Sequence, residues 1–83
     1  MTAPFQYTDS TGIIKYVEVK SFDSGSFHLS GSEYEFGKDH EADYEIWLVQ
    51  NQKNIIPIKD FFVNKKYKTV IADFIVHVEL IIH

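Results

Sequence analysis

Most of this chain alternates apolar and polar residues with a period of two, which favours half-buried β-strands over helices. Alternation and β-branched or aromatic content predict five strands, at residues 5–8, 13–20, 44–50, 55–59 and 70–82. The turn cluster at 9–12 predicts that the first two strands form a hairpin. Residues 44–50 are apolar on both faces, as in an interior strand. Pro57 limits its strand to an edge, and 60–68 form a short helix or a loop.

One helix start interrupts this pattern. Ser30-Gly31-Ser32-Glu33 has the form of a capping box, in which Ser and Glu satisfy free backbone donors, and it predicts a helix over 31–41. Leu29, Tyr34, Gly37 and Lys38 are expected to lie toward the core. Gly37 costs such a helix about 1 kcal/mol relative to Ala, so close packing is expected there. The predicted fold is α+β (or α/β), with one mixed sheet of about five strands and one main helix.

The length and composition of the chain exclude several classes of protein. The 83 residues suffice for a single domain, 1–83, and a hydrophobic fraction of 45% excludes disorder. The absence of cysteine excludes disulfide scaffolds and cysteine-based zinc sites, and it favours a reducing, cytoplasmic setting. No apolar run has the length of a membrane span or of a signal peptide core, so no membrane association is expected.

The charged residues argue against a sequence-specific DNA-binding protein. Eight basic residues, all lysine, stand against twelve acidic ones, giving a net charge of -4. Arginine is the usual bidentate reader of phosphate and guanine, and it is missing. Weak phosphate contact stays open through a set of lysines: Lys53, Lys59, Lys65, Lys66 and Lys68. The alternative is that these lysines only keep the protein surface hydrated and contact no nucleic acid.

The strand at 13–20 contains the most suggestive pair of charged residues. Glu18 and Lys20 are two apart, so they share one face of the strand, while Val17 and Val19 share the other. A carboxylate and an ammonium placed this way can hold a divalent metal and a water beside a phosphodiester. The alternative is a plain ion pair at a sheet surface, worth less than about 1 kcal/mol.

The order of short motifs resembles a known family. After Glu18-Val19-Lys20 come Leu29-Ser30, then Ser32-Glu33-Tyr34-Glu35, then Asp43-Tyr44, then Ile58-Lys59-Asp60. Over roughly residues 12–60 this is similar to the C-terminal domain of the plant protein NO VEIN, which also occurs in bacterial defence proteins. That family reads Glu-Val-Lys, Leu-Ser or Leu-Thr, Asn-Glu-Trp-Glu and Asp-x-Tyr. More broadly, the chain resembles the restriction-endonuclease-like superfamily with its PD-(D/E)XK core.

The resemblance implies roles for three residues. Glu18 would be the carboxylate that binds Mg²⁺ or Mn²⁺ if the site is active, Lys20 the motif lysine, and Glu33 a further site residue at the helix start. Glu33 has a simpler alternative as the third-position partner of the capping box.

One departure from that family concerns the first motif, an Asp on the preceding strand opposite the motif Glu. If the hairpin is centred on residue 11, position 4 lies opposite Glu18, and position 4 is Pro4. Asp9 lies at the turn, about 16 Å from Glu18 along the strand. Asp23 follows the motif but is expected to be a turn residue. The chain also begins too close to the first strand for the N-terminal helix that supports such cores.

The histidines offer no metal motif. His28, His40, His77 and His83 lack the spacing of a metal site, and His77 is expected on the polar face of the last strand. No glycine-rich phosphate loop or nucleophile elbow is present.

Three functions remain open from the sequence. The first is a nuclease-fold domain with a degenerate site that acts as a binding or interaction module in nucleic-acid processing or defence. The second is a metal-dependent DNA or RNA endonuclease completed in trans by a second chain. The third is a small acidic inhibitor or immunity protein. The apolar residues of 70–82, among them Phe74, Ile81 and Ile82, predict a homodimer or docking on a larger protein.

Overall fold

The computed structural model describes residues 4–22, 24–72 and 75–80, and their fold is α+β. None of the helical structure in these ranges is long and apolar enough to cross a membrane. The elements are β1 (Phe5–Thr8), β2 (Ile14–Ser21), β3 (Ser26–Ser30), α1 (Gly31–Asp39), β4 (Tyr44–Gln50), β5 (Asn54–Ile58), β6 (Tyr67–Ala72) and β7 (Ile75–Leu80).

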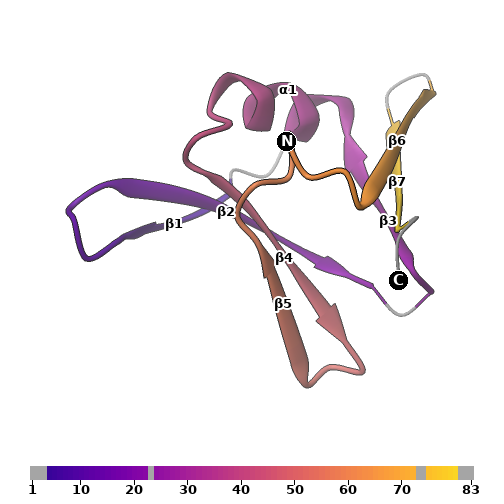
Figure 1. The fold of residues 1–83 in the computed structure, drawn as a ribbon, viewed down its shortest axis with the longest axis horizontal. Coiled ribbons are helices and arrows are strands. Elements are labelled where there is room, and N and C mark those ends of the chain that lie inside the picture. Colours follow the sequence, from indigo (N-terminus) through magenta and orange to yellow (C-terminus); the bar gives the residue numbers. More distant parts are fainter. Residues whose placement is uncertain (1–3, 23, 73–74, 81–83) are drawn as a thin grey trace.

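The strands form two sheets. A mixed four-stranded sheet has the order β1-β2-β4-β5, in which β2 and β4 are parallel and the outer pairs are antiparallel. An antiparallel three-stranded sheet has the order β3-β7-β6. Figure 1 shows α1 at the top of the view, with the larger sheet below it and the smaller sheet to the right. The crossover from β2 to β4 runs through β3 and α1, and the helix packs against β3, β4 and β7.

The core lies between the two sheets. Ile46 and Leu48 of β4 are fully buried against Leu29 of β3 and Val76 and Val78 of β7. These side chains occupy alternate positions on their strands, as the period-two pattern requires. Because Glu18 and Lys20 pair with Ile46 and Leu48 across the parallel ladder, they share this inner face.

Several local predictions are confirmed. The first hairpin has the expected register, with Phe5 opposite Val17, so its centre is residue 11. The strand at 44–50 is interior, and the strand that contains Pro57 is an edge strand. The helix begins at Gly31 with Ser30 as its cap.

The packing expected at Gly37 is also present. A Cβ atom at Gly37 would lie 2.6 Å from the ring of Tyr44, so only glycine lets helix and strand approach this closely. Lys38, expected toward the core, is exposed.

Two predictions about the sheets are wrong. A single sheet of about five strands is replaced by seven described strands in two sheets, because residues 26–30 form β3, which sequence analysis did not identify. The long strand at 70–82 is a hairpin, since Ala72 pairs with Ile75. Alternation continues through this reversal without glycine or proline, so the pattern does not reveal it. Phe74, Ile81 and Ile82 lie outside the described residues.

Candidate functional site

The structure brings the three residues Glu18, Lys20 and Glu33 together on the inner face of β2. Glu18 is 8% exposed, and Lys20 next to it on that face extends toward the start of α1. The Lys20 Nζ atom lies 2.8 Å from Glu33 Oε1 and 3.0 Å from Oε2. The sequence prediction that Glu18 and Lys20 share a face near Ser30 is therefore confirmed.

Glu33 is the third-position partner of the capping box and also contacts Lys20 of the candidate site. Its backbone N–H donates to Ser30 Oγ at 3.1 Å, and its Oε1 accepts from the Ser30 backbone N–H at 2.8 Å, which completes the capping box. The same carboxylate accepts both bonds from Lys20. The helix cap thus holds Glu33 in the orientation that faces β2.

The pKa values of the two carboxyl groups at this site are shifted in opposite directions. Burial raises the pKa of Glu18 to about 7, and the charge of Glu33 and a hydrogen bond with it add to the effect, while Lys20 opposes it. Burial also acts to raise the pKa of Glu33, but the bonds from Lys20 and Ser30 outweigh it and the pKa is lowered. Glu18 therefore gains and loses its proton near neutral pH, beside a Glu33 that is already ionised.

Tyr44 is a member of this site that the search for charged residues missed. Its hydroxyl is buried and has no hydrogen-bond partner among the described residues. The parallel ladder places Tyr44 on the same face of the sheet as Glu18. Burial raises the pKa of Tyr44, and the charges of Glu18 and Glu33 raise it further. Tyr44 belongs to the Asp43-Tyr44 motif of the family resemblance. From the sequence, that motif indicated only the start of a strand.

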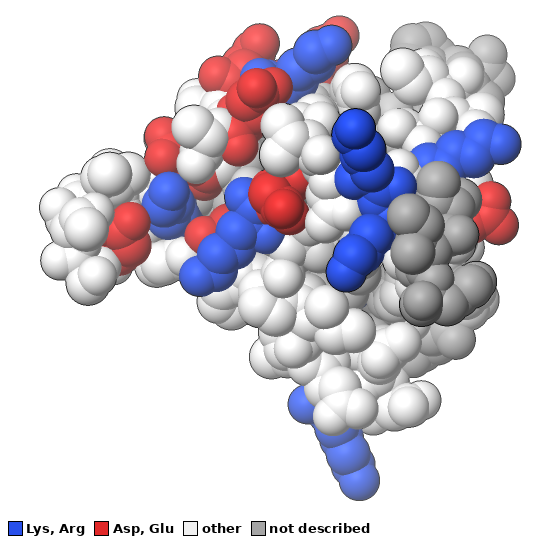
Figure 2. Space-filling view, in the orientation of Figure 1, with Lys and Arg blue, Asp and Glu red and all other residues white. Residues whose placement is uncertain are grey.

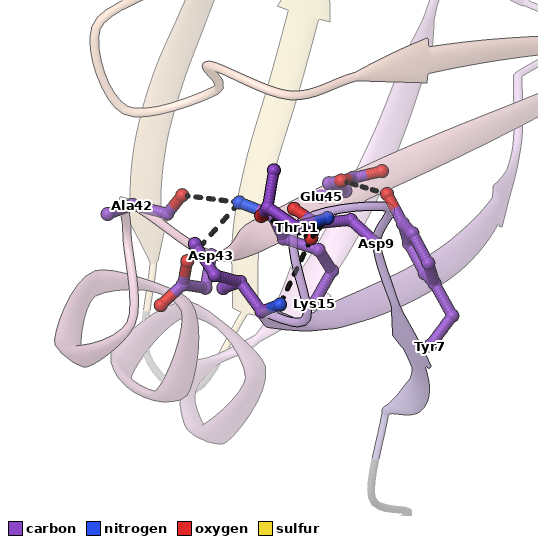
Figure 3. A network of polar contacts seen from close by, with 8 residues as sticks. Tyr7, Asp9, Thr11, Lys15, Ala42, Asp43 and Glu45 are labelled. Atoms are coloured by element: carbon purple, nitrogen blue, oxygen red, sulfur yellow. Dashed lines mark hydrogen bonds and ion pairs between the residues drawn. The ribbon is translucent and has the colours of Figure 1, made fainter.

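The second carboxylate of a metal-binding pair is missing opposite Glu18. Continuing the ladder by one residue from Phe5 and Val17 places Pro4 opposite Glu18, as the sequence predicted. Asp9 stays at the turn, where its Oδ1 accepts from Thr11 Oγ1 at 2.6 Å and from the Ile13 backbone N–H at 3.0 Å. The bond from Thr11 is the main reason that the pKa of Asp9 is lowered. Figure 3 shows Asp9 beside Thr11.

Asp23, the other acid near the motif, lies outside the described residues, so the structure leaves its predicted turn role untested.

Two histidines meet although their sequence spacing gave no sign of it. His28 on β3 pairs with His77 on β7, and His77 Nδ1 lies 2.9 Å from His28 Nε2. His40 instead ends α1, stacked on Phe36. In residues 4–22, 24–72 and 75–80, no three metal-ligating side chains come together as a metal site.

Comparison with known families identifies the chain's relatives. A family model described as "Protein NO VEIN, C-terminal" matches residues 5–61, well over half of the sequence. The chain belongs to the NO VEIN C-terminal family. The matched part contains β1 through β5 and all of the candidate site, whereas β6 and β7 follow it. Searches of curated proteins and of solved structures found no match.

Within this member of the NO VEIN C-terminal family, the site is a closed polar cluster. It contains one ammonium, one ionised carboxylate and one carboxyl group whose pKa is about 7. Such a cluster can bind and release a proton near pH 7. A hard divalent cation prefers several oxygen ligands, and here one carboxylate is already occupied by Lys20.

Proposed function

We propose that this chain is a restriction-endonuclease-like domain whose active site is degenerate, and that it binds a partner in nucleic-acid processing or defence without cutting nucleic acid. A PD-(D/E)XK ancestry would account for the Glu18-Val19-Lys20 strand and for the helix that follows it, both of which lie in the part of the chain that matches the NO VEIN C-terminal family.

The observation that carries the proposal is the register of β1 and β2, in which Phe5 lies opposite Val17, so that the next residue, Pro4, continues the ladder opposite Glu18. Metal-dependent cleavage of a phosphodiester needs carboxylates on both sides of the metal, because one carboxylate displaces too little water from Mg²⁺ or Mn²⁺. Pro4 has no side-chain oxygen. The residues present therefore do not fit the expected metal.

The state of Lys20 supports the same conclusion. In a working site, a lysine orients the attacking water or balances the charge of the phosphate. Here Lys20 bonds both oxygens of Glu33 at 2.8 and 3.0 Å. Using Lys20 for a phosphate would break this ion pair, which is largely shielded from solvent.

Binding without cutting would use the lysines away from this cluster. Lys59, Lys65, Lys66 and Lys68 lie on or beside the connection from β5 to β6, and all four are exposed. Figure 2 shows lysines over the centre and right of the visible face, with acidic side chains concentrated toward the upper left. Nucleic acid held by such lysines would be bound weakly and lost as salt rises.

The test is a cleavage assay on plasmid, linear and single-stranded DNA and on RNA, with Mn²⁺, with Mg²⁺ and with a chelator. We expect no cleavage above that of a mock purification. Metal-dependent cleavage that disappears in both Glu18→Ala and Lys20→Ala would overturn the proposal. Cleavage that survives both substitutions would come from a contaminant and would leave the proposal intact.

A nuclease completed in trans is the second candidate. The observation that favours it is the buried Tyr44 hydroxyl, an unused donor beside two acids. A second chain that supplied a carboxylate would make cleavage rise more steeply than linearly with protein concentration. We expect no such activity between low and high micromolar protein, and its appearance with Mn²⁺ would replace the first proposal by this one.

A further inference from the structure

The outer face of β2, opposite the Glu18 site, contains an aromatic pocket. Val17 and Val19 form its floor, and its walls come from the neighbouring strands. The cavity is about 230 Å³ and is lined by Phe5, Gln6, Tyr7, Val17, Val19 and Trp47. Phe5 is 72% exposed, so one aromatic wall faces solvent, while Val17 is buried beneath the rings.

A buried carboxylate joins the two inner walls of this pocket. Glu45 on β4 lies opposite Val17 and is 3% exposed. Its Oε2 accepts from the Tyr7 hydroxyl at 2.5 Å, and its Oε1 accepts from Trp47 Nε1 at 2.9 Å. The bond to Glu45 is the largest reason that the pKa of Tyr7 rises to about 12. Figure 3 shows Tyr7 reaching Glu45 in this way.

Both donors to Glu45 are neutral groups. Neither of the two ion pairs in the described part of the chain includes Glu45. Lys15 lies opposite Tyr7 on β2, but its ammonium turns to Asp43 Oδ1 at 3.2 Å and to the Ala42 carbonyl at 3.4 Å. The negative charge beneath the aromatic rings thus has no cation of the described chain to balance it.

An aromatic pocket with a buried carboxylate hydrogen-bonded to two of its rings forms a recognition site for cations. The ring quadrupole attracts an ammonium or guanidinium, and a nearby charge in a low-dielectric setting strengthens that attraction. We propose that the pocket of Phe5, Tyr7 and Trp47, backed by Glu45, binds an alkylammonium or guanidinium group such as a lysine or arginine side chain of a protein partner. The aliphatic stem would lie on Val17 and Val19, with the charge against the rings.

This inference does not depend on the proposed function, because Glu18 and Lys20 point to the other face of β2. Its test uses a matched pair of probes. One is choline; the other is its uncharged isostere, in which a tert-butyl group replaces the trimethylammonium. Trp47 is the only tryptophan of the chain, so its fluorescence and its indole N–H resonance report binding directly.

We expect choline to bind the wild-type protein at least about fivefold more tightly than the isostere, in line with the usual strength of a cation–π contact. Equal binding of the two probes would mean a purely apolar pocket and would overturn the proposal. Binding of neither probe would overturn it as well. These outcomes are read on the unmodified protein, so they do not require any variant to fold.

Three variants then test the part played by the buried charge. Glu45→Gln keeps the size of Glu45 and one of its two acceptor oxygens but removes its charge, so the preference for choline should fall to about twofold or less. Glu41→Gln changes the net charge equally at an exposed position and should leave the preference unchanged. Loss of the preference in both variants, or in neither, would overturn the role assigned to Glu45. Tyr7→Phe keeps the ring and the charge, and it should retain the preference even if Glu45→Gln does not fold.

Discussion

The ammonium of Lys20 bonds both carboxylate oxygens of Glu33, at 2.8 and 3.0 Å, and thereby ties the middle of a strand to the cap of a helix. One of these oxygens also accepts the Ser30 backbone N–H. Glu33 is therefore structural and part of the candidate site at once. Changes at this cluster should therefore affect folding as well as binding.

Glu18 should make the stability of the protein depend on pH. Its pKa of about 7 in the folded protein exceeds the ordinary value of 4.5, so the native state holds the proton more tightly than the unfolded chain. The free energy of unfolding contributed by this group is then lost as pH rises from about 4.5 to about 7, by up to about 3 kcal/mol. Urea unfolding at pH 5 and pH 8 measures the change.

The matched comparison for this prediction is Glu18→Gln against Glu35→Gln, an exposed position of α1. The Glu18 variant should lose the decline above pH 5, and the Glu35 variant should follow the wild type. A wild-type decline that persists unchanged in Glu18→Gln would assign the effect to other groups.

Removal of the helix cap should cost measurable stability. Ser30→Ala deletes the acceptor for the Glu33 backbone N–H and should lower the free energy of unfolding by about 1 kcal/mol. Ser32→Ala, two residues on and exposed, should change it by less than about 0.5 kcal/mol. Chemical denaturation of the two variants measures both free energies of unfolding. Equal losses in the two variants would argue against a stabilising cap at Ser30.

Gly37 should resist replacement although alanine is the better helix former. A methyl group there would meet the Tyr44 ring at 2.6 Å, so Gly37→Ala should destabilise by about 1–3 kcal/mol, against an intrinsic gain of about 1 kcal/mol. Thermal unfolding measures the net effect. A more stable Gly37→Ala variant would show that the helix and β4 can separate at low cost.

Supplying an acid opposite Glu18 should increase metal binding. Pro4→Asp places a carboxylate across the antiparallel ladder from Glu18, where the two side chains share a face. We expect Mn²⁺ to bind this variant at least about tenfold more tightly than the wild type, as measured by calorimetry.

The control for this prediction is Gln6→Asp, which adds the same charge on the same face of β1 but opposite Tyr16. Tighter Mn²⁺ binding in both variants would reflect net charge alone. No change in Pro4→Asp would mean that the absent acid does not limit metal binding.

Local sequence by itself determined much of the architecture around the candidate site. The turn residues at 9–12 set the hairpin register, and that register alone placed Pro4 opposite Glu18. Ser30 and Glu33 marked the helix start. These features are predictable because each depends on residues a few positions apart, where backbone preferences and short-range hydrogen bonds decide the outcome.

Tertiary structure alone decided which distant segments meet. The alternation at 70–82 fits one long strand as well as a hairpin, and only pairing of β7 with β3 and β6 selects the hairpin. Pairing of β3 with β7 brought His28 to His77, and pairing of β2 with β1 and β4 brought Tyr7 to Glu45. Packing between the two sheets buried Glu18 enough to raise its pKa. A period-two pattern predicts which side chains of a strand face the core. The packing between the sheets determines which residues surround each side chain, and hence its charge state.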